Sequence, residues 1–416
     1  MSEKIKIAVV GLGGRGLGMI KSVITKIEDL EISAVCDLYP DRVEAAIATV
    51  VERCGNTPYG TTDYKEILER DDVEAVYIAS AWESHVEIAI AAQKAGKATA
   101  LEVGGAYSCE ELWELVKTHE ETGTPFMLME NCCYNDNELF ATAAARAGVL
   151  GRVVHCSGAY GHDLRNEIAC GNIKRHYRLR NYTTRNAENY PTHELGPIAR
   201  LLNINRGNRM VSLVSVASGA FGMEQYVKDH PELVEQDPTL EGRKFNQGDV
   251  VNTIITCQNG ETIALKLDTT LPRSYSREFT VKGTKGYYDQ TTNTLFLDGM
   301  KEMWSADKYL DAYAGNAKEY YDDYMPDVWN KLTEEEKKTG HGGMDGIMFR
   351  AFVKAYKEGG EMPIDVYDCA AWMCITALSA ESVAMGGMPR AIPDFTNGKW
   401  VLREPVDVMN LIKEKK

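Results

Sequence analysis

The chain has 416 residues, which is enough for two or three domains. Hydrophobic residues make up 44% of it and charged residues 26%, values typical of a folded globular protein rather than a disordered one. The 61 acidic and 46 basic residues give a formal net charge of −15, which argues against nucleic-acid and anionic-membrane partners, because both need a basic face.

The sequence also indicates the compartment. It has no run of 18 apolar residues, and its first ten residues enter a β-like stretch without an apolar leader. The ten cysteines are scattered, and the only tight pair, Cys132 and Cys133, is adjacent rather than spaced for a metal or a redox couple. We therefore expect a cytoplasmic protein with reduced thiols and no metal site.

From residue 5 to about residue 130, short β-rich runs alternate with helical ones. The expected strands are 7–10, 31–36, 75–79, 98–101 and 125–129, and the expected helices are 14–27, 41–53, 63–69, 84–95 and 109–122. This alternation predicts an α/β domain with a doubly wound parallel sheet over residues 1–130.

After Asn131 the pattern changes. The expected elements are a helix at 136–148, strands at 152–160, 210–217, 249–257, 262–269 and 276–282, and helices at 345–358 and 366–385. Asn259-Gly260 between two of these strands is a strong hairpin signal. We therefore predict an α+β domain over 131–416 with a large, mostly antiparallel open sheet.

Three finer expectations concern the second half. Residues 300–345 are polar and aromatic with weak periodicity, which favours a long loop. The C-terminal helices can pack back on the first domain. The charged segment 405–416 is expected to pack on the surface.

A glycine-rich segment follows the first strand and opens the first helix. Gly11, Gly13 and Gly16 fit the pattern G-x-G-x-x-G, with Gly14 and Arg15 between them. Glycines at these positions allow a tight turn, close approach of a pyrophosphate to the backbone, and close packing of helix on strand. With the helix N-terminus as the anion-binding end, the segment predicts a Rossmann-type dinucleotide site.

Asp37 closes the second strand, where a carboxylate can accept both ribose hydroxyls. Its charge disfavours a 2′-phosphate, so NAD is preferred over NADP. Arg15 and Arg42 leave NADP as an open alternative.

Further polar residues lie at the expected carboxyl ends of parallel strands, where open α/β sheets bind ligands. Glu102 follows the strand 98–101, and Glu130 with Asn131 follows the strand 125–129. A helix cap or an ion pair is an equally acceptable role for Glu130.

The second domain contains a second group of candidates. Tyr160 ends its first strand, and a helix predicted to start near Thr192 places Tyr190 and His193 at or beside its first turn. A hydroxyl and an imidazole three residues apart at a helix start form a plausible acid–base pair, because that position favours a neutral imidazole. A purely structural role for His193 remains open.

These residues resemble those of a known family. The segments 7–16 and Cys36-Asp37, with Glu102 and His193, look like the Gfo/Idh/MocA oxidoreductases. More narrowly, the segments 130–134, 158–165, 189–197 and 341–345 resemble the NAD-dependent glycosidases of glycoside hydrolase family 109, whose members are described as α-N-acetylgalactosaminidases. The resemblance extends from about residue 5 to 390.

Two departures from the parent family favour this narrower match. Ordinary members have Glu-Lys-Pro where this chain has Glu102-Val103-Gly104, and a carboxylate where it has Asn189. A conventional sugar dehydrogenase without both groups would lack its expected proton relay, whereas the glycosidase branch also lacks the lysine.

The resemblance implies a redox-neutral glycosidase that oxidises the sugar at C3, eliminates the aglycone across C1–C2, adds water and re-reduces C3. Unlike most glycosidases, this route needs no carboxylates on both sides of the glycosidic bond. Tyr190 and His193 would transfer the protons of C3–OH and C2–H, Glu130 would orient the sugar or the nicotinamide, and Tyr160 would contact sugar or cofactor.

The remaining implied roles are binding ones. Substrate contacts would come from Asp163, Arg165 and His341. NAD contacts would come from Gly11, Gly13, Gly14, Arg15, Gly16, Asp37, Glu102 and Asn131. The expected partners are a small carbohydrate and further copies of the chain in a homo-oligomer.

Two alternatives stay open at this point. One is a net NAD-dependent sugar dehydrogenase of the same fold, and the other is a non-catalytic sensor of a sugar or nucleotide. Fold analogy alone does not decide between them.

Overall fold

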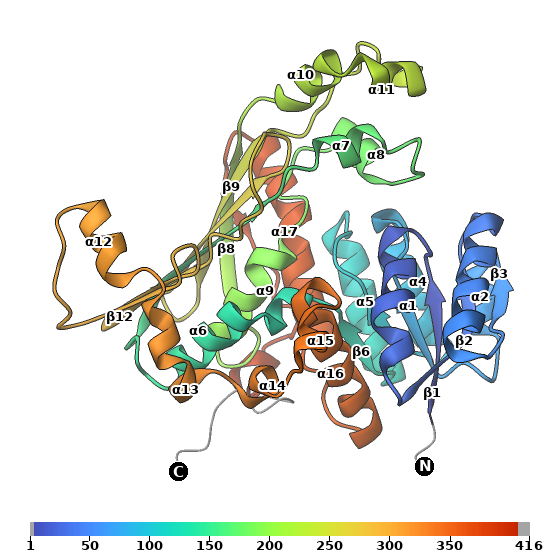
Figure 1. Ribbon diagram of the computed structural model, residues 1–416, viewed down its shortest axis with the longest axis horizontal. Helices are drawn as coiled ribbons and strands as arrows, with labels where there is room; N and C mark the ends of the chain where they lie inside the picture. The colour runs from blue at the N-terminus through green and yellow to red at the C-terminus, as the bar shows by residue number, and fades with distance from the viewer. Residues whose placement is uncertain (1–3, 407–416) are drawn as a thin grey trace. The chain divides into compact units, whose positions relative to one another are not determined.

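The computed structural model describes residues 4–406, so almost all of the expected surface segment 405–416 lies outside the described residues. The contacts divide the described chain into two units, shown together in Figure 1. Unit 1 consists of residues 4–135, 331–370 and 406, and unit 2 consists of residues 136–330 and 371–405.

Unit 1 contains a six-stranded sheet in the order β3-β2-β1-β4-β5-β6, in which every neighbouring pair is parallel. The strands are β1 (Ile5–Val10), β2 (Leu30–Cys36), β3 (Tyr59–Thr61), β4 (Ala75–Ile78), β5 (Ala98–Leu101) and β6 (Phe126–Leu128). The predicted doubly wound parallel sheet is confirmed. Among the strands of this sheet, the prediction missed only β3, a three-residue edge strand with a glycine at its centre.

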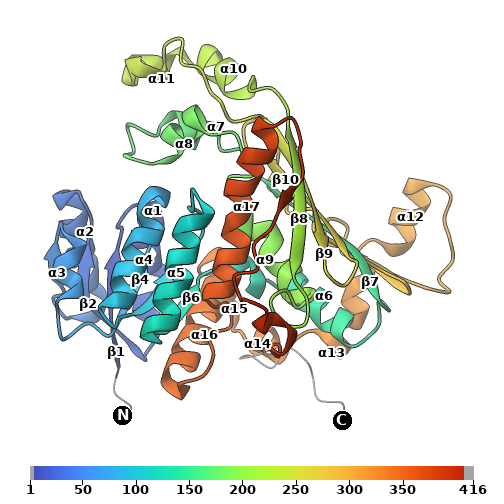
Figure 2. The same ribbon diagram turned by 180° about the vertical axis from the view of Figure 1, so that it is seen from behind.

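Helices accompany this sheet in the expected alternation (Figure 2). They are α1 (Gly14–Ser22), α2 (Pro40–Cys54), α3 (Tyr64–Leu68), α4 (His85–Lys94) and α5 (Cys109–Thr122). Local signals define their ends: Ser108 and Glu111 form a capping box at the start of α5, and Gly123 ends it in a left-handed conformation. Strands β4 and β5 are buried throughout, as expected for parallel strands covered on both faces.

Unit 2 contains an eight-stranded sheet in the order β13-β12-β11-β7-β10-β9-β8-β14. The strands are β7 (Val153–Gly161), β8 (Met210–Ala217), β9 (Val250–Cys257), β10 (Thr262–Asp268), β11 (Thr280–Gly283), β12 (Gly286–Asp289), β13 (Thr294–Leu297) and β14 (Arg390–Ala391). Only β7 and β10 pair in parallel, so the prediction of a mostly antiparallel sheet is confirmed.

One face of this sheet is covered and the other is open. Along β9, Val251, Thr253, Ile255 and Cys257 are buried, whereas the alternate residues between them are exposed. The covering helices include α9 (Thr192–Leu201), which packs on β7, and the last part of α17 (Val366–Ala384), where Ser382 accepts the Ser215 N–H of β8 at 2.9 Å. On the other face, Ile254 and Val216 are 47% and 52% exposed.

The prediction for residues 276–282 was wrong in its boundary, because β11 begins only at Thr280. The two short strands that follow it, β12 and β13, were not predicted. Strands of four residues with glycine or turn residues beside them offer too few alternations for the period to show.

The prediction of a long loop over 300–345 was also wrong. The segment contains α12 (Ala306–Tyr313), α13 (Tyr321–Tyr324), α14 (Asp327–Asn330) and α15 (Glu334–Lys337), and then the start of α16 (Met344–Glu358). None of these first four helices has a buried residue, so the apolar stripe that identifies a helix in a sequence is missing. Four further short helices were missed, namely α7 (Arg165–Ala169), α8 (Arg178–Thr184), α10 (Gly222–Asp229) and α11 (Pro231–Gln236).

Helix α16 and the chain around it belong to unit 1, although they lie about 200 residues after the last strand of its sheet. Leu128 of β6 donates its N–H to the Ile364 carbonyl at 2.9 Å, and the ring of Phe349 meets that of Tyr77 edge-on at 5.1 Å. Residues 341–345 consequently lie in the same unit as the glycine-rich segment.

Two further sequence expectations can be compared with the fold. All ten cysteines are free thiols, most of them buried. Within residues 4–406, no helix is both long enough and apolar enough to cross a bilayer.

A buried ion pair links α6 (Asp136–Arg146) to the approach to β11 in unit 2. Arg277 Nε donates to Glu138 Oε1 at 2.8 Å, and Gln290 donates to the same oxygen at 2.9 Å. Glu138 is 1% exposed and Arg277 is 7% exposed, so neither charge has water as a substitute partner.

Glu138→Gln should therefore lower the free energy of unfolding by about 3 kcal/mol, because it removes a buried charge that pairs with the Arg277 guanidinium. Urea denaturation followed by circular dichroism measures this. The control is Glu224→Gln, which breaks an exposed pair with Lys244 (2.7 Å) and should cost less than about 1 kcal/mol. Equal effects of the two changes would contradict the assignment.

Candidate functional site

In unit 1, the turn after β1 has the geometry that a dinucleotide site needs. Gly11 has φ +92°, and a Cβ on it would lie 2.4 Å from the backbone of Ala79 and Ser80. A Cβ on Gly16 would lie 1.8 Å from the Gly11 carbonyl oxygen, so α1 approaches the turn closely. A Cβ on Gly14 would meet nothing within 4 Å, which leaves the backbone at the start of α1 accessible to a pyrophosphate. The residues present therefore fit NAD.

Asp37 is held beside this turn. Its Oδ2 accepts the Leu12 N–H at 2.7 Å, its Oδ1 accepts the Tyr39 N–H at 3.1 Å, and Arg42 Nη1 lies 3.5 Å away. The predicted ribose carboxylate is thus fixed in orientation before any ligand arrives, and Arg42 is the nearest cation to it.

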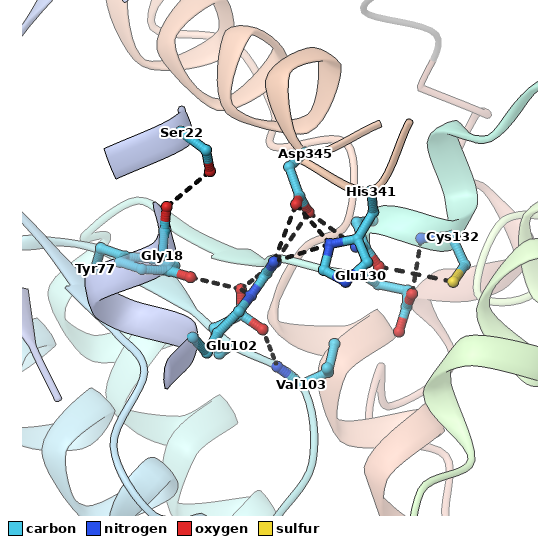
Figure 3. A network of polar contacts seen from close by, with 11 residues as sticks. Gly18, Ser22, Tyr77, Glu102, Val103, Glu130, Cys132, His341 and Asp345 are labelled. Atoms are coloured by element: carbon cyan, nitrogen blue, oxygen red, sulfur yellow. Dashed lines mark hydrogen bonds and ion pairs between the residues drawn. The ribbon is translucent and has the colours of Figure 1, made fainter. Parts of the chain in front are cut away.

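Arg15 does not extend alone into the site but lies between two carboxylates, those of Glu102 and Asp345, which are labelled in Figure 3. It donates to Glu102 at 2.9 Å and to both oxygens of Asp345, at 2.9 and 3.0 Å. Tyr77 donates to Glu102 at 2.6 Å. Burial opposes the charge on Asp345, but the guanidinium and His341 hold the pKa of that carboxyl below its usual range.

Asn131 and His341, both predicted site residues, contact the same carboxylate, that of Asp345. Asn131 donates to Asp345 at 2.8 Å, and His341 Nδ1 lies 2.8 Å from it and 3.3 Å from Arg15. Glu130 is fully buried and accepts the Cys132 N–H at 2.9 Å, which is the geometry of a helix cap. Its catalytic role stays a prediction.

The loop after β5 replaces the parent family's lysine with a buried valine. Val103 is 4% exposed, and the next residue, Gly104, has φ +86° with space for no side chain, because a Cβ would lie 2.1 Å from the Trp82 ring. His85, which the sequence reading missed, fixes this loop through its ring nitrogens, 2.9 Å from the Gly104 carbonyl and 3.0 Å from that of Ser80.

In unit 2, the three predicted residues Tyr160, Tyr190 and His193 form one aromatic cluster. The ring centroids of Tyr160 and Tyr190 lie 4.7 Å apart, those of Tyr190 and His193 4.7 Å, and those of Tyr160 and His193 5.4 Å. Helix α9 begins at Thr192 as predicted, so His193 lies in its first turn. Gly158 allows this contact, since a Cβ there would lie 2.9 Å from the Cβ of Glu194 on α9.

Three further residues, which were not predicted as site residues, complete the cluster. His162 Nδ1 lies 3.2 Å from the Tyr160 hydroxyl, and the His162 and Tyr275 rings meet at 5.2 Å. Arg178 is buried, with its guanidinium carbon 5.2 Å from the Tyr190 ring centre and its Nε 2.7 Å from Glu167. His162 lies in the segment 158–165 but was not among the predicted site residues, whereas Arg178 and Tyr275 lie too far along the chain to share a motif with Tyr160.

Burial changes the pKa values of two residues of this cluster, Tyr160 and His162. It raises the pKa of Tyr160, and together with the Arg178 charge it lowers the pKa of His162. Tyr160 therefore stays a neutral hydroxyl and His162 a neutral imidazole near pH 7, and both can act as hydrogen-bond partners without an added charge.

The predicted substrate contacts Asp163 and Arg165 pair with each other, with nitrogen–oxygen distances of 2.8 and 2.6 Å. The Arg165 guanidinium also lies over the Tyr226 ring of α10 at 4.9 Å. The pair therefore joins the end of β7 to α10, and its contact with a sugar stays a prediction.

The comparisons with known proteins agree with the features of each unit. Residues 5–130 match the oxidoreductase family with an NAD-binding Rossmann fold, and residues 134–402 match the C-terminal domain of glycosyl hydrolase 109. Among solved structures, levoglucosan dehydrogenase in complex with NADH and levoglucosan superposes with a TM-score of 0.68 at 18% identity, covering 94% of this chain and all of that one. Scyllo-inositol dehydrogenase from Lactobacillus casei, with NAD(H) and scyllo-inositol, gives 0.65 at 15% identity, covering 94% and 99%.

The fold is thus that of the NAD-dependent sugar dehydrogenases, and the chain has an NAD-binding Rossmann domain. More narrowly, the chain belongs to glycosyl hydrolase family 109. It is 35% identical to a family 109 protein from Stenotrophomonas maltophilia (97% of this chain and 92% of that one). It is 33% identical to an alpha-N-acetylgalactosaminidase from Tannerella forsythia (96% and 88%).

Asp37→Ser should shift cofactor preference toward NADP. The change removes the charge that repels a 2′-phosphate, leaves Arg42 to pair with it, and keeps an oxygen near the Leu12 N–H. We expect the ratio of NADP to NAD affinities, measured by calorimetry, to rise at least about tenfold, or about 1.4 kcal/mol. Adding Arg42→Ala should cancel the gain, and an unchanged ratio in Asp37→Ser would show that the ribose is held elsewhere.

Two buried carboxyl groups, Glu188 and Glu194, flank Tyr190 and His193 in the sequence. They are 0% and 2% exposed, and burial raises the pKa of Glu188 to about 8, against the opposing influence of Glu194 and of the Tyr190 and Leu267 backbone. Folded protein therefore binds a proton here that unfolded chain releases near pH 4.5.

The free energy of unfolding should fall as pH rises from about 5 to 8, since within that window the folded state binds more protons than the unfolded one. The contribution of Glu188 to this slope is at most about 1.4 kcal/mol per pH unit. In Glu188→Gln that contribution disappears, which urea denaturation at several pH values would detect. An identical slope in the variant would contradict it, and Glu224→Gln is the exposed control.

Proposed function

We propose that this chain is an NAD⁺-dependent glycosidase that acts on N-acetylgalactosaminides or related glycosides. The observation that supports the chemistry best is the cluster of Tyr160, Tyr190 and His193 at the first turn of α9. The glycosidase class follows from the family, and the sugar follows from the activity named for one relative, the alpha-N-acetylgalactosaminidase of Tannerella forsythia.

In unit 2, Tyr190 and His193 are the acid–base residues. One accepts the proton of the C3 hydroxyl while C3 is oxidised, and the other removes the C2 proton, which the C3 ketone has made acidic. The aglycone then leaves C1 by elimination, water adds to C1, and C3 is reduced again. Atoms and electrons balance without net oxidation, and the product is the free sugar and the aglycone.

The other cluster residues orient the sugar. Tyr160 and His162 present a hydroxyl and an imidazole 3.2 Å apart, and Tyr275 provides an aromatic face 49% exposed to solvent. Arg178 places a buried positive charge beside the Tyr190 ring, which favours loss of a proton from that hydroxyl. Asp163 and Arg165 are proposed substrate contacts.

In unit 1, the backbone of the turn 11–16 and the start of α1 would hold the pyrophosphate, and Asp37 the ribose. When bound, NAD⁺ supplies a reversible acceptor for the C3 hydride. Glu102, Asn131 and Glu130 lie at the carboxyl ends of β5 and β6, and we propose that they contact the cofactor or the sugar. His341 is proposed as a further substrate contact.

Three wider proposals accompany this function. We propose that unit 1 is the cofactor-binding part of the chain and unit 2 the substrate-binding part. The protein would act in the cytoplasm on a small carbohydrate. It would form a homo-oligomer through the open sheet face, where Ile254 and Val216 are exposed side by side on paired strands β9 and β8.

The experiment is to incubate the NAD-loaded protein with α- and β-linked glycosides in D₂O and follow aglycone release, NADH absorbance and deuterium at C2 together. Aglycone release with deuterium at C2 and no net NADH is the expected result. Accumulation of NADH from an intact glycoside would instead make the protein a dehydrogenase, and binding without turnover across the panel would make it a sensor.

His193→Ala should lower aglycone release at least about a thousandfold, in the range seen when a general acid–base group is removed, while NAD affinity stays within about twofold. The matched control is His119→Ala, in the last turn of α5, which should keep full activity. Normal turnover by His193→Ala would overturn its proton-transfer role.

A further inference from the structure

Asp345 binds more partners than any role in substrate contact requires. It is fully buried at the start of α16. Its two oxygens lie within 3.0 Å of Arg15, Asn131 and His341, which are 330, 214 and 4 residues away in the chain. Figure 3 shows Asp345 and His341 on one side of this network and Glu102 with Tyr77 on the other.

Two of these partners, and the second carboxylate that binds Arg15, belong to the predicted dinucleotide site. Arg15 belongs to the glycine-rich turn, Asn131 follows β6, and Glu102 follows β5. A guanidinium between Glu102 and Asp345 has its charge balanced by two carboxylates, so it is not available as the main counter-ion of a pyrophosphate. That task remains with the backbone N–H groups at the start of α1.

The residues just before Asp345 have an unusual left-handed backbone conformation. Residues 340–343 all have positive φ, of 42°, 49°, 76° and 99°, and His341 is not a glycine. A Cβ on Gly340 would lie 2.8 Å from the Cβ of Asp345. Backbone of this kind costs about 1 kcal/mol or more at a non-glycine residue and usually serves a positioning role.

Helix α16 does not depend on Asp345 for its packing. Ile347, Met348, Phe349 and Phe352 are completely buried and anchor the helix through apolar contacts. The Asp345 side chain is therefore directed to the site rather than to the core of unit 1.

We propose that Asp345 is a positioning residue of the NAD site, which fixes the glycine-rich turn through Arg15 and the end of β6 through Asn131. This role concerns cofactor binding and is independent of the proposed sugar chemistry. It rests on the proposed NAD site alone, so a failure to cleave glycosides would not contradict it.

The test measures NAD⁺ affinity by isothermal titration calorimetry, without sugar, in Asp345→Asn, Arg15→Gln and the double variant. Asp345→Asn keeps the shape and the contact with Asn131 but removes the charge that orients Arg15. We expect NAD⁺ to bind about tenfold or more weakly in each single variant. The double variant should be no weaker than about the poorer single one, because both changes break the same interaction.

The matched control is Asp368→Asn, another buried aspartate of unit 1, which accepts the Asp365 N–H at the start of α17. It should lower the melting temperature and leave NAD⁺ affinity within about twofold. A merely structural Asp345 would behave in the same way, with a lower melting temperature and unchanged affinity, and that result would overturn the proposal.

Removal of a buried charged partner can prevent folding. If Asp345→Asn does not fold, Arg15→Gln and His341→Ala decide, since the His341 side chain is 59% exposed and its loss leaves the core unchanged. Weaker NAD⁺ binding by both folded variants supports the proposal. Wild-type affinity in either variant overturns it, and where Asp345→Asn does fold, fully additive losses in the double variant overturn it as well.

Discussion

The charge of Arg15 is the constraint on which this part of unit 1 depends. Its half-buried guanidinium pairs with two buried carboxylates, one from the end of β5 and the other from the start of α16. Satisfying that one charge therefore joins the glycine-rich turn, the parallel sheet and a helix more than 300 residues away. The Rossmann half of the site is complete only when the C-terminal segment is present, and residues 331–370 accordingly belong to unit 1.

Unit 2 meets a comparable constraint with aromatic side chains. Arg178 is buried beside Tyr190 and paired with Glu167, while Tyr160 and His193 pack on the same ring. Three side chains from different parts of unit 2 thus pack around one phenol ring. Under the proposed function, Tyr190 and His193 are the two proton acceptors of this cluster.

The sequence was sufficient for both sheets, because buried parallel strands and alternating antiparallel strands differ in their apolar period. It was insufficient for β12, β13 and the short helices of residues 306–337, which are too short or too exposed to show a period. Tyr190 and His193 could be predicted as a pair because they lie three positions apart at a helix start. Arg178 and Tyr275 were not, since only the folded chain brings them to Tyr160 and Tyr190.

The two departures from the dehydrogenase pattern acquire a physical meaning in the structure. The position of the missing lysine holds Val103, which is buried, and the position of the missing carboxylate holds Asn189, whose amide donates to Gln247. Neither side chain can exchange a proton near neutral pH. This is consistent with the proposal that Tyr190 and His193 transfer the protons. Removal of both the C3–OH proton and the C2–H proton requires two proton acceptors. Simple oxidation of an alcohol requires only the acceptor for the hydroxyl proton. The arrangement thus favours elimination over net dehydrogenation.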